Sequence, residues 1–161
     1  MALDIQEKAW QAGQIDALVC FEPIAGTLLR QGAHLLFDSR ALPNLILDVL
    51  AIRPEAAIEY DEALRALIAG HFRALAHLHT HPQDAGYRLA VHLGGDGGKA
   101  LDAFRGLILP DATANRRLLA GSSPELLRAA REISTVMVGH RLLPAPAQLA
   151  GLIRADYLPK S

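Results

Sequence analysis

Three short polar stretches in the first third of the chain carry the side chains best suited to holding a ligand. Each follows an apolar run of strand length or a turn beside one. In open α/β sheets, ligands bind beyond the carboxyl ends of the strands, and a helix that begins there presents free N–H groups. We therefore expect ligand-binding residues at these positions: Phe21, Glu22, Pro23, Asp38, Ser39 and Asn44.

Glu22 determines which ligands suit this site. Its carboxylate would repel an anion and would pair with a cationic or amine-bearing ligand. Alternatively, Glu22 only stabilises the helix that follows it, since a carboxylate near a helix N-terminus is electrostatically favourable. Asp38, Ser39 and Asn44 have an equivalent alternative, because short polar side chains hydrogen-bond within their own turns. The residues alone leave both explanations open.

Histidines gather near the end of a long apolar stripe. His77 and His81 are four residues apart, so on a helix they share a face at a spacing that can hold a metal. His79 points away from that face, and neither an HExxH glutamate nor a cysteine accompanies them. A solvated helix end explains them better, because cationic histidines suit the dipole there. We expect no metal site, and we expect His71 to pack in the core or at an interface.

Other residues typical of catalysis lack their usual surroundings. The glycine-rich stretch 94–99 follows a predicted helix and lacks the GxxxxGK[ST] pattern, so it is expected to be a turn. Ser122 and Ser123 lack the G-x-S-x-G pattern and instead precede Pro124-Glu125, which is typical of a capped helix start. Cys20 lies in an apolar run and is expected to be a small core residue. We therefore predict no catalytic residue, no cofactor and no enzymatic activity.

Composition and charge narrow the class of protein. With 161 residues, of which 51% are hydrophobic and 20% charged, the chain suits one globular domain with a core. The net charge of −1 argues against a nucleic-acid partner, because binding to phosphates requires a basic surface. No apolar run approaches the roughly 20 residues that span a bilayer. The N-terminus lacks the apolar core of a signal peptide, which favours either a cytosolic chain or a true N-terminus elsewhere.

The front of the chain predicts a short parallel sheet. Ile15–Phe21 and His34–Phe37 are apolar runs of strand length, and a helix is expected between them, from Glu22-Pro23 to about Gln31. This strand–helix–strand order is a βαβ unit, which joins parallel strands. Leu45–Ile52 is expected to form a third strand, because turn residues flank it on both sides.

From Pro54 onward, almost the whole chain is expected to be helical. The longest helix is predicted to begin at about Glu55 or Asp61 and to end at Thr80, because apolar residues recur there at helical spacing. Start and stop signals predict further helices over 2–12, 83–93, 99–107 and 112–120, another from 122 onward, and a last one opened by the prolines at 144 and 146.

The order of these features resembles a known family. The stretch Gly13-Gln14-Ile15-Asp16-Ala17 to Phe21-Glu22-Pro23 resembles the G-x-I-D-A … E-P junction of solute-binding proteins from ABC importers for nitrate, sulfonate and taurine. Proteins that bind thiamine precursors are similar. Segments 32–39 (GAHLLFDS) and 43–53 (PNLILDVLAIR) resemble the strands that follow in this family, and Tyr157-Leu158-Pro159 has a counterpart. The resemblance covers most of this chain but only the latter part of the family's fold.

The resemblance implies an α/β fold. It implies part of a type II periplasmic-binding-protein fold, with a short parallel sheet in front and a mostly helical C-terminal half. Residues 1–42 would end lobe two, and residues 43–161 would return through a hinge and supply helices of lobe one. The implied function is a periplasmic solute-binding protein, or a C-terminal fragment of one, that serves ABC transporter membrane subunits. Its solute would be small and organic or anionic, such as a sulfonate, nitrate or a thiamine precursor.

Two other functions fit the same features. An enzyme of the same superfamily that makes the thiamine pyrimidine would share the fold and would form a product. A helical interaction module with a vestigial sheet would show neither solute binding nor product formation. A sheet of so few strands leaves its edges unpaired, and such edges recruit another chain. We therefore expect either a homo-oligomer or a missing N-terminal half to cover the predicted strands.

Overall fold

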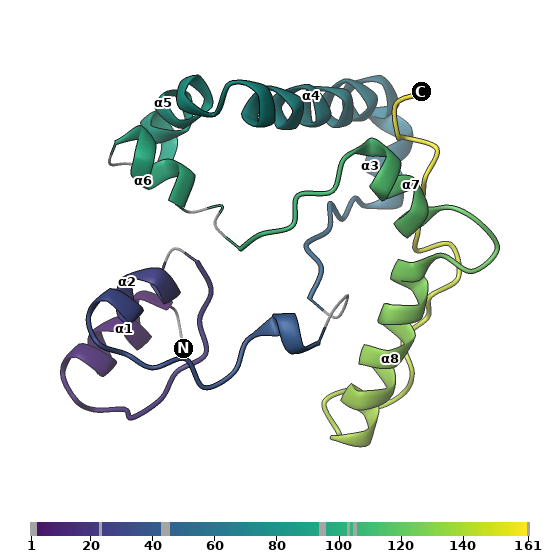
Figure 1. Cartoon of the computed structure of the whole chain (residues 1–161). Coiled ribbons are helices and arrows are strands. Elements are labelled where there is room, and N and C mark those ends of the chain that lie inside the picture. The colour runs from purple at the N-terminus through teal and green to yellow at the C-terminus, as the bar shows by residue number, and fades with distance from the viewer. Residues whose placement is uncertain are drawn as a thin grey trace. The chain divides into compact units, whose positions relative to one another are not determined.

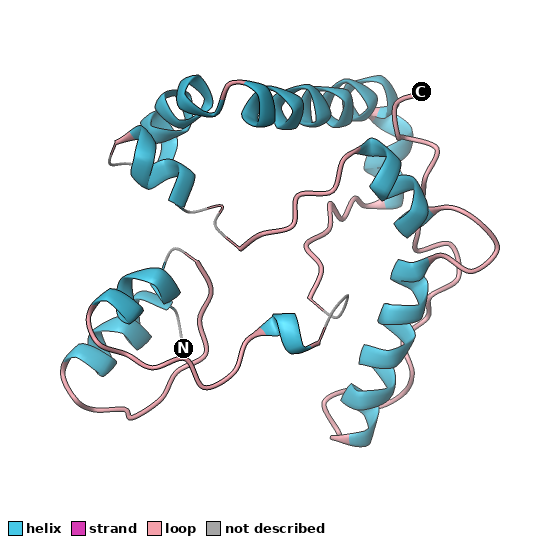
Figure 2. Ribbon diagram, in the orientation of Figure 1, coloured by secondary structure: helices cyan, strands magenta, loops and turns pink. Residues whose placement is uncertain are grey.

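The structure, a computed structural model, describes residues 3–22, 24–42, 46–93, 96–102, 104 and 106–160. Among these residues all regular structure is helical, and none of them forms a strand (Figure 2). The chain divides into two compact units, and each unit is built from two separate segments. No helix in the described part of the chain is both long and apolar enough to cross a membrane.

The first unit consists of Met1–Phe37 and His81–Leu107. It contains helices α1 (Leu3–Gln11), α2 (Ile24–Arg30), α5 (Pro82–Leu93) and α6 (Gly97–Asp102) (Figure 1). Helices α1, α2 and α5 confirm the predicted helices, while α6 ends earlier than expected. Gly13 and Gly32 follow the first two helices with φ values of 67° and 97°. This left-handed conformation is the usual helix ending, and it needs glycine.

Helices α5 and α6 pack closely because glycines line their contact. A Cβ on Gly86 would lie 2.6 Å from the carbonyl oxygen of Gly97, and a Cβ on Gly97 would lie 3.1 Å from the backbone nitrogen of Tyr87. The neighbouring Ala85 and Ala100 are 7% and 1% exposed. The absence of side chains at the glycines therefore lets two backbones meet and bury the alanines between them.

The second unit consists of Asp38–Thr80 and Ile108–Ser161. It contains the short 3-10 helix η1 (Ser39–Ala41) and helices α3 (Pro54–Glu59), α4 (Asp61–Thr80), α7 (Ala112–Leu119) and α8 (Glu125–Gly139). The predominantly helical region predicted after residue 54 is confirmed up to residue 139.

A corner at Tyr60 separates α3 from α4. The Tyr60 N–H donates to the Ala56 carbonyl at 2.9 Å, and its own carbonyl accepts the Leu64 N–H at 2.9 Å. With φ −116° and ψ 30°, Tyr60 ends one helix and directly precedes the next. Asp61 and Glu62 occupy the first turn of α4, where carboxylates are favoured by the helix dipole.

The hydrophobic core of the described residues is thin. Four of the six buried hydrophobic residues are alanines, and the full set is Ala9, Leu28, Leu75, Ala85, Ala100 and Ala129. Since fully burying a large aliphatic side chain contributes about 1.5–3 kcal/mol and alanine much less, this core supplies little stability. Many large apolar side chains lie instead at the surface.

The predicted α/β fold, part of a type II periplasmic-binding-protein fold, is wrong for the described residues. The expected βαβ unit and third strand are absent, because residues 17–21, 33–38 and 47–53 are neither helical nor paired. An apolar run records a preference for burial, but a strand also needs a second strand to pair with its N–H and C=O groups. The described chain supplies no such partner. Leu45, at the start of the third predicted strand, lies outside the described residues.

Two predictions near the C-terminus are also wrong. Helix α8 has Pro124 at its N-cap and no side-chain cap hydrogen bond, so the expected serine cap is not formed. No helix follows Pro144 in the described residues. The segment instead returns beside α8, where the Ala147 N–H donates to the Ser134 hydroxyl oxygen at 2.9 Å. Ser134 is 6% exposed, so this hydrogen bond is shielded from water and fixes the returning segment.

Candidate functional site

Glu22 stands at the start of α2, as its sequence position predicts. Its Oε2 accepts the Gly26 N–H at 3.0 Å. A Cβ on Gly26 would lie 2.9 Å from that same oxygen, so glycine allows the carboxylate to approach. The carboxylate thus satisfies an N–H in the first turn of a helix that has no other acidic residue there. The neighbouring Phe21 is 66% exposed, and Pro23 lies outside the described residues.

Asp38 caps the 3-10 helix η1. Its Oδ1 accepts the Arg40 N–H at 2.9 Å, and its Oδ2 accepts the Arg40 Nε–H at 2.8 Å and a second guanidinium N–H. Hydrogen bonds from Arg40 hold the pKa of the Asp38 carboxyl below its usual value. The exposed Ser39 begins η1, and Asn44 lies outside the described residues.

The predicted ligand-binding residues do not gather within one compact unit. Phe21 and Glu22 belong to the first unit, whereas Asp38 and Ser39 belong to the second. Glu22 and Asp38 both make the local hydrogen bonds that sequence analysis offered as an alternative to a ligand role.

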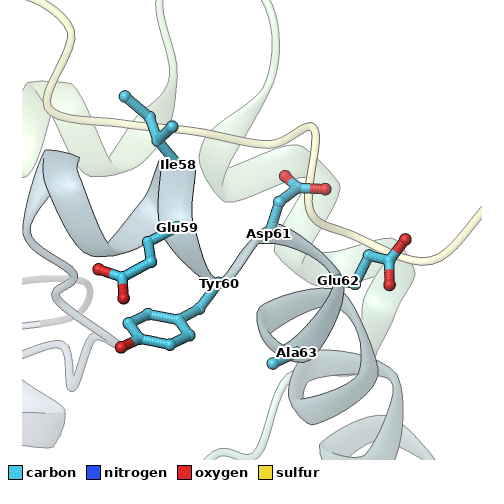
Figure 3. A pocket seen from close by; sticks show the side chains of 6 residues that line it. All are labelled: Ile58, Glu59, Tyr60, Asp61, Glu62 and Ala63. Carbon is cyan, nitrogen blue, oxygen red and sulfur yellow. The ribbon is translucent and has the colours of Figure 1, made fainter.

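An open hollow lies at the corner between α3 and α4. It has a volume of about 410 Å³ and is lined by Ile58, Glu59, Tyr60, Asp61, Glu62 and Ala63. Figure 3 shows the Glu59 and Tyr60 side chains together on one side of the corner and the Asp61 and Glu62 carboxylates on the other. Because all six residues are consecutive, the hollow is a bend in one chain segment and not a deep cleft between elements.

The charges at this corner disfavour an anionic ligand. Three of the lining side chains are carboxylates, and a hydrogen bond with Glu59 raises the pKa of the Tyr60 hydroxyl. Hydrogen bonding from Arg65 lowers the pKa of Asp61, which is therefore ionised at neutral pH. No group of histidine, cysteine or carboxylate side chains in the described residues has an arrangement suited to a metal ion.

The segment Arg154–Pro159 forms a polar cluster with α3, α4 and α7. The Tyr157 hydroxyl donates to the Ala57 carbonyl at 3.0 Å. The guanidinium carbons of Arg65 and Arg154 lie 4.7 Å and 5.3 Å from the centroid of the Tyr157 ring. Arg116 donates to the carbonyl of Pro159. Sequence analysis missed this cluster, since its partners lie 43 to 100 residues apart and no local pattern links them.

The remaining reactive side chains lie in ordinary surroundings. Cys20 is half-buried, and both burial and the nearby Glu22 raise the pKa of its thiol. It is therefore protonated at neutral pH and a poor nucleophile. His71 is exposed and meets Phe72 edge-to-face with ring centroids 5.2 Å apart, so this histidine does not pack in the core, and its place at an interface stays a prediction. The glycines at 94 and 95 lie outside the described residues.

The chain matches no protein-family model, no curated protein and no solved structure.

Proposed function

We propose that this chain is a non-catalytic binding protein whose principal ligand is another polypeptide, in the first place a second copy of itself. The observation that carries the proposal is the exposure of large apolar side chains in segments that form neither helix nor strand. In the first unit these are Val19, Phe21, Leu35, Leu36 and Phe37, which are 55% to 90% exposed. In the second unit they are Ile46, Val49 and Leu50, which are 61% to 75% exposed.

The exposed side chains of these segments leave a large apolar area in water for a small protein. Phe21 and Phe37 are 66% and 64% exposed, and phenylalanine side chains bury about 150–250 Å² each, so this pair alone leaves on the order of 200–300 Å² in water. Soluble monomers rarely keep contiguous apolar patches above a few hundred Å². Covering these side chains contributes about 1.5–3 kcal/mol each, against a typical stability of about 5–15 kcal/mol for a whole domain.

The backbone of the same segments also favours a polypeptide partner. Residues 17–21, 33–38 and 47–53 make no ladder hydrogen bonds within the described chain. At the ends of these segments the Ala33 N–H and the Phe21, Asp38 and Arg53 carbonyls bond to neighbouring turns. The other N–H and C=O groups can pair with another chain, which gives affinity that a small molecule cannot match. A second copy is the simplest such partner, because the net charge of −1 produces almost no repulsion between copies.

The described side chains support a role without catalysis. The single cysteine is a protonated thiol, and Glu22 and Asp38 are held by Gly26 and Arg40. None of these groups is paired with a base in the arrangement that activates a nucleophile.

Solute binding is the second candidate, and one observation favours it. Glu22 and Asp38 each stand at the end of an irregular apolar segment, immediately before a helical turn begins. This order of features is the one on which the resemblance to importer solute-binding proteins depends. In that case the chain binds a small solute, with the second polypeptide supplying the rest of the site, and delivers it to transporter subunits in the periplasm.

Light scattering on the intact chain tests polypeptide binding. We expect dimers or larger assemblies at micromolar concentration that dissociate on dilution. Val19→Asp places a charge in an apolar segment and should weaken association about tenfold or more. Burying a valine side chain contributes at least about 1.5 kcal/mol, and about 1.4 kcal/mol corresponds to a tenfold change in affinity. Val91→Asp makes the same change on α5, where Val91 is 81% exposed, and should have little effect. A chain that stays monomeric at every concentration would contradict the proposal.

Calorimetry with the assembled protein tests the second candidate separately. Taurine, nitrate and a thiamine precursor are the probes, and Glu22→Gln and Asp38→Asn are the variants. Solute binding that both variants weaken, with the assembly state unchanged, supports the second candidate. Assembly without heat of solute binding leaves polypeptide binding as the function.

A further inference from the structure

Arg65 uses three nitrogen atoms to join two parts of the second unit. Its Nε and Nη2 donate to the Asp61 carboxylate at 2.8 Å and 3.2 Å, one turn earlier on α4. Its Nη1 donates to the Asp156 carbonyl at 2.7 Å, across 91 residues. Its guanidinium also lies against the Tyr157 ring. Only a planar guanidinium can make these contacts at once, because a lysine ammonium is a single point charge.

The segment that Arg65 holds is fastened at further points on either side. The Arg154 guanidinium forms two hydrogen bonds with the Asp156 carboxylate, at 2.7 Å and 2.6 Å, which fixes the local bend of the segment. The Tyr157 hydroxyl binds the Ala57 carbonyl of α3, and Arg116 of α7 binds the Pro159 carbonyl. One short segment therefore connects three helices.

We infer that residues 154–159 form a strap, which fastens α3, α4 and α7 through Tyr157, Arg65 and Arg116 and can be released without unfolding α4 and α7. The contacts described above are hydrogen bonds, ion pairs and cation–π contacts, and the ion pair between Arg65 and Asp61 is exposed, with side chains 46% and 44% accessible. Exposed ion pairs are weak and are screened by salt. The helices themselves depend on internal hydrogen bonds that the strap does not supply.

Opening of the strap removes hydrogen-bonding partners from groups on α3, α4 and α7. Asp61 contacts Arg65 and also lines the hollow at the corner between α3 and α4. When the strap opens, the Ala57 carbonyl and the Arg65 and Arg116 guanidiniums lose partners from residues 154–159.

Hydrogen exchange on the intact chain tests the strap with a matched pair of variants. Arg65→Met removes an i,i+4 ion pair together with the contacts to the strap. Arg88→Met removes the equivalent ion pair between Arg88 and Asp84 on α5, where the Nε–Oδ2 distance is 2.7 Å and no strap contact exists. We expect Arg65→Met to speed exchange of the Leu158 N–H, which donates to the Ala155 carbonyl at 3.1 Å, and of amides in α3 about fivefold or more. Arg88→Met should leave these amides unchanged.

Two further measurements separate the strap from a general loss of stability. Arg65→Lys keeps the charge but loses the planar fork, so it should resemble Arg65→Met and not the wild type. Raising the salt from about 0.1 M to 1 M shortens the Debye length from about 10 Å to 3 Å and should speed strap exchange while far-UV helicity stays constant. Equal exchange in the Arg65 and Arg88 variants, or strap exchange that accelerates only when the helices melt, would overturn the inference.

Discussion

The Tyr157 hydroxyl lies 3.0 Å from the Ala57 carbonyl oxygen and donates a hydrogen bond to it, across 100 residues of sequence. Ala57 belongs to α3, which has only six residues, and helices this short are marginal by themselves. The position of α3 therefore depends on tertiary contacts such as this one.

The contact between α5 and α6 predicts a strong effect at Gly86. A methyl group there would lie 2.6 Å from the Gly97 carbonyl oxygen, so Gly86→Ala must push two backbones apart. We expect a loss of about 1–3 kcal/mol in the free energy of unfolding, measured by urea denaturation. Gly70→Ala is the control, because Gly70 lies inside α4 with only a side-chain nitrogen of Arg73 nearby, at 3.7 Å. That change should stabilise the chain by about 0.5–1 kcal/mol. Equal effects at both glycines would contradict the close packing of α5 and α6.

The cap of α7 predicts a contrast between two capping positions. Asp111 Oδ1 accepts the Ala114 N–H at 2.7 Å, so Asp111→Ala should cost about 0.5–2 kcal/mol in thermal or urea unfolding. Ser123 precedes Pro124 at the start of α8, where no side chain caps the helix. Ser123→Ala should therefore change stability by less than about 0.5 kcal/mol. A large loss at Ser123 would show that its hydroxyl caps α8 after all.

The pairing of Asp156 with Arg154 predicts the titration of that carboxyl group. Hydrogen bonds from Arg154 lower the pKa of Asp156 to about 2. Since the folded value lies below the unfolded one, this pair adds stability above about pH 4 and loses it as the pH falls toward 2. In Arg154→Met the carboxyl should titrate near its ordinary value of about 3.9, as followed by NMR of its side-chain carbon. A titration that is unchanged by the substitution would rule out the pairing in solution.

The surroundings of Cys20 predict slow alkylation. Burial raises the pKa of its thiol, and the Glu22 carboxylate adds to the shift. Because only the thiolate reacts, modification by iodoacetamide at pH 8 should be slower in the folded chain than in the chain unfolded by urea. Glu22→Gln should speed the reaction of the folded chain while leaving the unfolded rate unchanged. Faster reaction in the folded chain would mean that the thiol is activated.

Local signals in the sequence predicted much of the helical structure. Gly13 and Gly32 marked two helix ends, and the apolar spacing between residues 64 and 78 predicted the body of α4. Pro54 marked the point after which the chain becomes helical, and Pro82 marked the end of α4. Both prolines in fact begin helices, since proline fits the first helical turn. These features depend on residues a few positions apart, which a sequence displays directly.

The features that were not predicted depend on distant residues. Strand pairing needs a partner that the apolar run Ile15–Phe21 does not itself reveal, and the predicted sheet was wrong for that reason. The contacts of Tyr157 with Arg65 and Ala57 join residues about 90 to 100 positions apart, so no periodicity indicates them. Among the predicted site residues, Glu22 was correctly expected directly before a helix. The 3-10 helix after Asp38 was not predicted, although a hydrogen bond of Asp38 within its own turn was one of the alternatives.

The contacts of Tyr157 also impose an order of events during synthesis. Helices α3 and α4 leave the ribosome about 100 residues before the segment that fastens them, and translation adds about 5–20 residues per second. For roughly 5–20 seconds the nascent second unit therefore has the Ala57 carbonyl and Arg65 without these partners. During that interval these two groups must hydrogen-bond with solvent, with a chaperone or with a neighbouring chain that is already complete. Slowing the ribosome over the codons for residues 108–153 should lengthen this exposed stage and increase capture by chaperones.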